Sequence, residues 1–248
     1  MTGLLAAGFC QSAVAVDTAT LGQEQITKHF VIAEGLEVPT ETFSFTAAAV
    51  TKDAPDVTID SISYSSADNK GTLSTDGIYT LDKNAAITFG TFPHAGTYEY
   101  TVTETDSKAD GITYDSTSYT MIVYVANGSD GKLAVQSITV EAEDGKQEEL
   151  TFTNTYRKNG SLTISKKTEG TLADKTKDFA FTIEFFKSGT ESDSVASYTG
   201  EIGSEDVACN IGEKTTFYLH DNESLVFDNL PVGTRYVVTE VAAADGYT

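Results

Sequence analysis

Apolar and polar residues alternate along most of this chain, which is the pattern of β-strands that bury one face. The alternation predicts strands at residues 26–32, 43–49, 57–64, 98–104, 150–156, 161–167, 179–186, 215–221, 224–230 and 235–241. Residues 119–142 form two such runs around a turn rich in Asn, Gly and Asp, which predicts a β-hairpin. Helical periodicity is weak throughout, and at most a single turn of helix is expected near 47–55 and 204–214. The chain is therefore predicted to be all-β.

Three of these strands place a polar side chain on the same face as their apolar residues. Alternate residues of a strand point to the same side, so residues whose numbers share the same parity (even or odd) lie on one face. Lys28, Glu104 and Asn154 each share the parity of the apolar residues in their strand. Burying any one of them alone costs several kcal/mol. We therefore expect the three, called here the trio, to meet in one core.

Part of the pattern repeats in the second half of the chain. Lys166 and Glu240 also share the parity of apolar neighbours, and they are 74 residues apart where Lys28 and Glu104 are 76 apart. The corresponding asparagine would fall near residue 290, past Thr248. The repeat predicts two tandem immunoglobulin-like β-sandwiches, at 16–158 and 159–248, with the second incomplete.

Charge and composition narrow the class of protein. The net charge is −21, with 37 acidic against 16 basic residues, which argues against nucleic acid and anionic membranes as partners. Tryptophan is absent and there are only four prolines, which suits a chain made of strands.

Residues 1–15 are predicted to be the remnant of a secretion signal. A short apolar run precedes Ala13-Val14-Ala15, which has the small-x-small spacing of a cleavage site. The basic residues that usually begin such a signal are missing. We therefore interpret the segment as the end of a signal whose true start lies upstream, or as the result of a misassigned start codon. The alternative is a buried N-terminal segment. Cys10 would leave with this signal, and Cys209 alone, expected as a small core residue, offers no disulfide framework.

The trio has the groups needed for a covalent cross-link. Burial lowers the pKa of a lysine, which makes a neutral, nucleophilic amine accessible. Burial raises the pKa of a glutamate, which can then stay protonated, hydrogen-bond the asparagine carbonyl and pass protons to departing ammonia. The predicted product is a Lys28–Asn154 isopeptide bond, formed without metal or cofactor. The alternative is an ordinary, partly exposed Lys28–Glu104 pair, with Asn154 in a turn.

The motifs around the trio resemble those of a known family. ITK, YEYTVTE with the following GITYD, and LTFTNTY are similar to the streptococcal-type isopeptide-linkage domain of Gram-positive major pilins. LTISKKTEGT and LPVGTRYVVTE resemble the Cna B-type domain that follows it in two-domain shaft pilins. The resemblance covers about residues 20–248.

The resemblance implies a function and a role for each site residue. It implies a secreted, cell-wall-attached pilus shaft subunit that sortase joins to neighbouring subunits, with possible host surface ligands and no enzymatic activity beyond its own cross-linking. Lys28, Asn154 and Lys166 fall on the family's cross-link positions, and Glu104 and Glu240 on its catalytic glutamates. Lys146 is the candidate sortase-linkage lysine, and a solvated turn lysine is the alternative.

Other readings have less support in the residues. The main alternative function is the stalk of a larger adhesin, in which the same domains act as spacers. A hydrolase has no nucleophile–base pair to support it. The three histidines lack metal-ligand spacing, and Asp106, Asp110 and Asp115 are expected to be solvated loop acids rather than calcium ligands.

Overall fold

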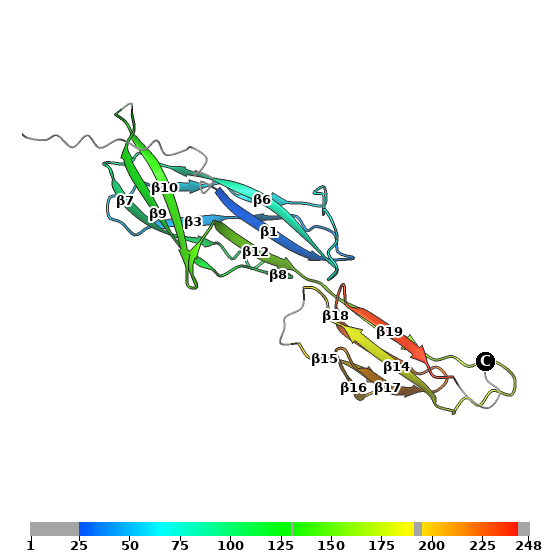
Figure 1. Cartoon of the computed structure of the whole chain (residues 1–248). Helices are drawn as coiled ribbons and strands as arrows, with labels where there is room; N and C mark the ends of the chain where they lie inside the picture. Colours follow the sequence, from blue (N-terminus) through cyan, green and yellow to red (C-terminus); the bar gives the residue numbers. More distant parts are fainter. Residues whose placement is uncertain (1–24, 130, 191–194, 243–248) are drawn as a thin grey trace, which may run out of the picture.

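The computed structural model describes residues 25–129, 131–190 and 195–242, whose regular elements are strands alone. Two groups of sheets follow each other along the chain (Figure 1). The predicted all-β class, with tandem sandwich domains, is confirmed. In this part of the chain no helix is long and apolar enough to cross a membrane. The predicted secretion signal, with Cys10, lies outside the described residues.

The first group contains two five-stranded sheets that enclose one core. The first sheet, in the order β4-β6-β1-β12-β8, consists of β1 (Gln25–Ala33), β4 (Val57–Ile59), β6 (Ile78–Phe89), β8 (Ile112–Thr113) and β12 (Leu150–Tyr156). The second, in the order β11-β10-β9-β7-β3, consists of β3 (Phe45–Ala49), β7 (Gly96–Glu104), β9 (Ser118–Asn127), β10 (Leu133–Ala142) and β11 (Gly145–Gln147). A short separate pair is formed by β2 (Glu41–Phe43) and β5 (Ile62–Tyr64).

The first and last strands of this domain lie side by side. β1 pairs with β12 in parallel, with Lys28 opposite Phe152 and Phe30 opposite Asn154, and it pairs with β6 in antiparallel fashion on its other edge. Every second residue of β1 is buried from Ile26 onward, and β12 alternates in the same way. The alternation in the sequence therefore identified the inward faces of both strands correctly.

Some segments depart from the predicted strands. The run 43–49 is interrupted at Ser44, and 57–64 divides into β4 and β5, which belong to different sheets. The predicted hairpin is present as β9 and β10, with a register shift between Val135 and Ser137. Both expected helical turns are wrong, because 47–55 holds the end of β3 and a turn, and 204–214 holds β16 and the start of β17.

The second group of sheets encloses a smaller core of its own. One sheet, in the order β13-β18-β15-β16, consists of β13 (Asn159–Ser165), β15 (Ser197–Ile202), β16 (Glu205–Asn210) and β18 (Ser224–Pro231). The other, in the order β17-β14-β19, consists of β14 (Phe179–Phe186), β17 (Lys214–Leu219) and β19 (Arg235–Glu240). The predicted core residue Cys209 is fully buried here, and burial raises the pKa of its thiol.

Two glycines lie where the domains meet. A Cβ on Gly189 would come within 2.5 Å of the Asp76 carbonyl oxygen, and one on Gly233 would lie 3.1 Å from the Ala33 Cβ. Larger side chains would push the two domains apart at these points. At Gly189 the junction is a close contact with the backbone of Asp76, and at Gly233 it is a close contact with the side chain of Ala33.

Candidate functional site

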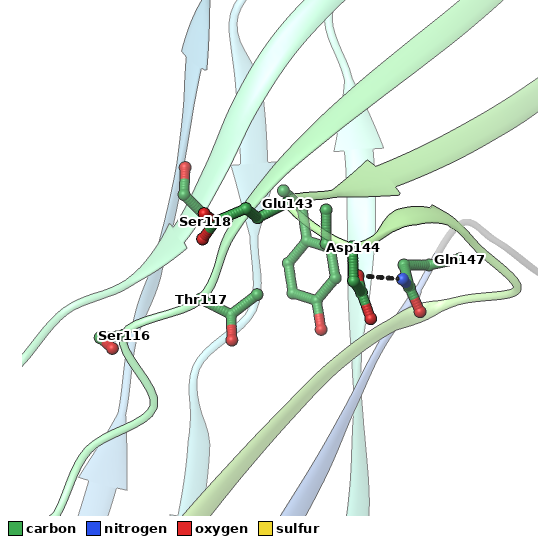
Figure 2. Close-up of a pocket in the computed structure, with 8 residues that line it drawn as sticks. Ser116, Thr117, Ser118, Glu143, Asp144 and Gln147 are labelled. Carbon is green, nitrogen blue, oxygen red and sulfur yellow. Dashed lines mark hydrogen bonds between the residues drawn. The ribbon is translucent and has the colours of Figure 1, made fainter.

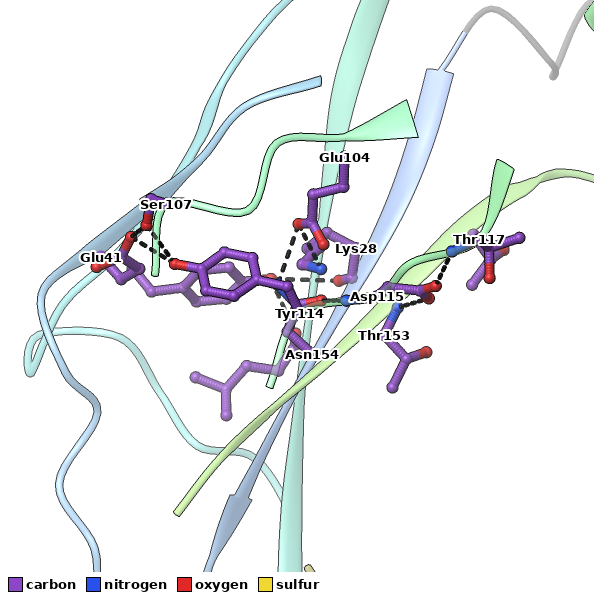
Figure 3. A network of polar contacts seen from close by, with 12 residues as sticks. Lys28, Glu41, Glu104, Ser107, Tyr114, Asp115, Thr117, Thr153 and Asn154 are labelled. Atoms are coloured by element: carbon purple, nitrogen blue, oxygen red, sulfur yellow. Dashed lines mark hydrogen bonds and ion pairs between the residues drawn. The ribbon is translucent and has the colours of Figure 1, made fainter. Parts of the chain in front are cut away.

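The trio is assembled from both sheets of the first domain. Lys28 and Asn154 come from the neighbouring strands β1 and β12, and Glu104 comes from the end of β7 in the opposite sheet. Figure 3 shows the three side chains pointing toward one another between the sheets. The structure thus brings together the three residues that parity selected.

The contacts within the trio are short and buried. Lys28 Nζ lies 2.8 Å from Glu104 Oε1, and both side chains are fully buried. Asn154, also fully buried, donates a hydrogen bond from Nδ2 to the same Glu104 oxygen at 3.1 Å. Among the described residues no aligned hydrogen bond reaches Lys28 Nζ, and Glu104 Oε2 has no partner. The amine and the amide thus meet at one oxygen of the same buried carboxyl.

Aromatic rings surround the amine. Lys28 Nζ lies 4.7 Å from the centre of the Phe43 ring, which packs edge-on against Phe30 with ring centres 5.1 Å apart. This burial lowers the pKa of Lys28 from 10.5 to about 8, although the contact with Glu104 and the charge of Asp115 oppose the shift. Burial raises the pKa of Glu104, with Lys28 opposing. Both shifts favour the neutral forms that cross-linking requires.

The asparagine amide is oriented differently from the sequence-based expectation. Its carbonyl oxygen, Oδ1, accepts a hydrogen bond from the backbone N–H of Asp115 at 2.8 Å, and its nitrogen faces Glu104. The expectation had Glu104 bonding to the carbonyl. A backbone N–H can only donate, so it takes the oxygen, which leaves the amide nitrogen for the carboxyl.

Asp115 is the residue at this site that sequence reasoning missed. It was expected to be a solvated loop acid, but its side chain is half-buried and its carboxylate accepts backbone N–H bonds from Thr153 at 2.7 Å and Thr117 at 2.8 Å. The only signal in the sequence was that Asp115 follows the GITY segment. That segment contains β8, which pairs with the last strand of the domain, β12.

The second domain holds the corresponding pair in a more open setting. Lys166 Nζ lies 2.5 Å from Glu240 Oε1 and 4.0 Å from the centre of the Phe179 ring. The Glu240 side chain is 42% exposed, whereas that of Glu104 is fully buried. Lys166 follows the last residue of β13, and Lys167 beside it is exposed, as the parity predicted.

The candidate linkage lysine lies away from the trio. Lys146 is exposed on β11, the short outer strand of the second sheet. Next to it an open cleft of about 600 Å³ lies between residues 116–119 and the turn at 142–147 (Figure 2). Gln147 Nε2 bonds to Asp144 Oδ1 at 2.6 Å and braces that turn. The lysine is therefore accessible next to this cleft.

The histidines and acids do not form a metal site in the described part of the chain. His29 bonds to Asp82 and His220 to Glu223, while His94 contacts Tyr98. No group of three or more potential metal-binding side chains lies together there.

Family models match both domains. Residues 25–157 match a model described as a Spy0128-like isopeptide containing domain, and residues 160–248 match one described as a domain of unknown function, DUF7601. The chain belongs to the Spy0128-like isopeptide-containing family. The predicted resemblance to streptococcal-type pilins is confirmed at this level.

Individual relatives come from streptococcal pili. A protein named "Pilin" from Streptococcus pyogenes serotype M1 is 33% identical over 156 residues, which are 60% of this chain and 46% of that protein. The pilus tip adhesin Cpa of Streptococcus pyogenes is 42% identical over 84 residues, 34% of this chain and 12% of the adhesin. The chain thus matches less than half the length of either. A solved structure of a Streptococcus pyogenes major pilin is 28% identical, with a TM-score of 0.42, and covers 90% of this chain and 85% of its own.

Proposed function

We propose that this chain is a structural subunit of a sortase-assembled pilus shaft, stabilised by a Lys28–Asn154 isopeptide bond that it forms by itself. The supporting observation is the fully buried contact of an amine, a carboxyl and an amide in the first domain. An ordinary ion pair in such a setting would cost more in desolvation than it returns.

The reaction balances with these three groups alone. The neutral Lys28 amine attacks Asn154 Cγ, and a tetrahedral intermediate forms as the new C–N bond is made. Glu104, protonated at the outset, delivers its proton to Asn154 Nδ2 and takes one from the attacking nitrogen, so that the old C–N bond breaks and ammonia leaves. The product is one secondary amide, and Glu104 ends in the protonation state in which it began.

The position of the bond suits a mechanical role. Lys28 lies near the start of β1 and Asn154 near the end of β12, so tension applied to the two ends of the domain passes through the bond. The residues between them, and the hydrogen bonds of both sheets, are then outside the path of the force. In the chain-entropy model a link across this loop stabilises the fold by about 4–5 kcal/mol.

The second domain is proposed to carry the same chemistry. β1 has β6 on one edge and β12 on the other, whereas β13 has β18 on one edge and, among the described strands, none on the other. A parallel strand on that free edge would bring an asparagine to Lys166 and Glu240 as β12 brings Asn154 to Lys28. We infer that this edge accepts such a strand.

Mass spectrometry tests the proposed function directly. The folded protein should be lighter than its sequence by one ammonia, and a protease digest should contain a branched peptide that joins Lys28 to Asn154. Lys28→Ala should restore the full mass. A wild-type protein that is folded and has its full mass would refute the proposal.

Polymerisation through Lys146 is tested with a sortase and the complete subunit. Lys146→Ala should abolish sortase-dependent ladders, and Lys52→Ala, which changes another exposed lysine, should not. Ladders that persist in the Lys146 variant would show that another lysine is used.

The adhesin stalk remains a second candidate because of the match to the tip adhesin Cpa. In that role the same cross-link would stiffen a spacer. Reading the complete gene separates the two, since a sorting signal soon after the second domain favours a shaft pilin and many further domains favour a stalk.

A further inference from the structure

The carbonyl of Asn154 is held by a single backbone donor. Asn154 Oδ1 accepts the N–H of Asp115 at 2.8 Å, so a fixed donor already points at the oxygen on which negative charge would develop. Glu104 contacts the nitrogen end of the same amide at 3.1 Å. The Asp115 N–H therefore holds the oxygen and Glu104 holds the leaving nitrogen, and the same N–H also interacts with the Glu104 carboxyl, where it lowers the pKa against the larger effect of burial.

The donor is held in place from both sides. The Asp115 carboxylate accepts the N–H of Thr153, the residue before Asn154 on β12, and the N–H of Thr117 on its own loop. Two residues earlier, Thr113 of β8 pairs with Thr155 on β12. Asp115 is thus fastened to β12 on each side of Asn154, which keeps its N–H aimed at the amide oxygen (Figure 3).

The chemistry needs a donor at this position. When the Lys28 amine adds to Asn154 Cγ, the π electrons of the carbonyl move to Oδ1, which becomes an alkoxide. A fixed N–H in a fully buried site stabilises that charge without reorganising. Glu104 is occupied with the transfer of a proton from the attacking nitrogen to the departing one, so one carboxyl does not have to serve both ends of the amide.

We propose that the backbone N–H of Asp115 is the oxyanion donor for cross-linking in the first domain and that the Asp115 carboxylate positions it. This inference rests on the proposed function. When the intermediate collapses, the electrons return from the oxygen to the carbonyl, the bond from Cγ to Nδ2 breaks, and ammonia departs with the proton from Glu104.

The test removes the N–H and keeps the side chain. The 248-residue chain is assembled chemically and kept in denaturant so that it has never folded, then folded by dilution and sampled by intact mass for the loss of ammonia. An ester at residue 115, made with the α-hydroxy analogue of aspartate, should slow that loss by about 10²–10³-fold. An ester chain that loses ammonia at the wild-type rate would overturn the inference, and a folded wild type that keeps its ammonia would instead overturn the proposed function.

Side-chain variants distinguish a role of Asp115 in positioning the N–H from a role in stabilising the fold. They also test the proposal if the ester chain does not fold. Asp115→Ala keeps the N–H but loses both carboxylate contacts, Asp115→Asn keeps one acceptor oxygen, and Asp115→Pro loses both the N–H and the carboxylate. Bond formation should slow in the order Asn, Ala, Pro. The same three changes are made in a Glu104→Ala background, where no bond forms, to measure their effect on unfolding. Equal rates for Ala and Pro, or rates that simply follow stability, would refute the role of the N–H.

Discussion

Lys28 and Glu104 reach each other from opposite sheets, with Nζ and Oε1 2.8 Å apart and both side chains fully buried. Neither residue has a neighbour in its own strand that could satisfy its charge. The parallel pairing of β1 with β12 then brings Asn154 within reach of the same carboxyl. The topology therefore determines which three groups can react.

Glu104 should be required for the bond and not merely for folding. Glu104→Ala should leave a folded chain that retains its ammonia in intact mass spectrometry, since the carboxyl that contacts the leaving nitrogen and carries the proton to it is then gone. Glu99→Ala is the matched control, because Glu99 lies on the same strand with the opposite parity. This variant should still lose one ammonia relative to the mass expected from its own sequence. Normal bond formation in the Glu104 variant would contradict the assigned role.

Loss of the bond should lower the stability of the first domain. Asn154→Ala removes the cross-link, and the free energy of unfolding should fall by about 4–5 kcal/mol, which lowers the melting temperature by more than about 10 °C. Calorimetry measures the change, and Asn127→Ala, at an exposed strand end, serves as control. An unchanged melting temperature would mean that no bond stabilises this domain.

Stability of the uncross-linked Asn154→Ala variant should rise with pH above about 8. The folded state holds Lys28 with a pKa of about 8, below the unfolded value of 10.5, so between these values the unfolded state binds more protons. The gain is on the order of 1–2 kcal/mol between pH 8 and 9.5. Near pH 10 it should reverse, because burial raises the pKa of Tyr64 and of Tyr100, the latter to about 12.

Denaturant titrations at each pH measure this dependence. Adding Lys28→Met to the Asn154→Ala variant should remove the rise, since the buried Lys28 amine is then gone. A rise of the same size in both variants would assign the effect to another group.

The sequence predicted the trio because its residues lie in long strands with one buried face. Alternation places Lys28, Glu104 and Asn154 inward without knowledge of the partner strands. Asp115 was missed for a physical reason, since the group that touches the site is a backbone N–H, which nearly every residue carries. Its carboxylate accepts hydrogen bonds from backbone N–H groups. No pattern of charged residues in the sequence could therefore indicate that it belongs to the site.

Other differences have equally local causes. Strand β6 was not predicted although Leu81, Ala85 and Ile87 alternate and are buried, because Asp82, Lys83 and Asn84 interrupt the apolar pattern. In the second domain, parity placed Glu240 inward, and it does lie opposite the buried Phe181. Its side chain is nevertheless partly exposed, because parity gives the face of a strand and not what covers that face.

The second domain of this 248-residue chain should unfold before the first. Its described strands enclose a smaller core, the outer edge of β13 is unpaired among them, and the Lys166–Glu240 contact is partly exposed. An unpaired edge and a lysine without a covalent partner both weaken the native state. Calorimetry should show two transitions, and a protease should remove residues beyond about 160 during the first while residues 25–157 survive.

A core substitution assigns the two transitions. Phe227 is buried at the centre of the second core, and Phe227→Ala should cost about 3–5 kcal/mol. This change should lower only the first transition, whereas Asn154→Ala should lower only the second. The close packing of Gly189 on Asp76 works against such independence, because it joins the domains at their junction. A single transition that both variants shift together would show that this junction makes the domains one cooperative unit.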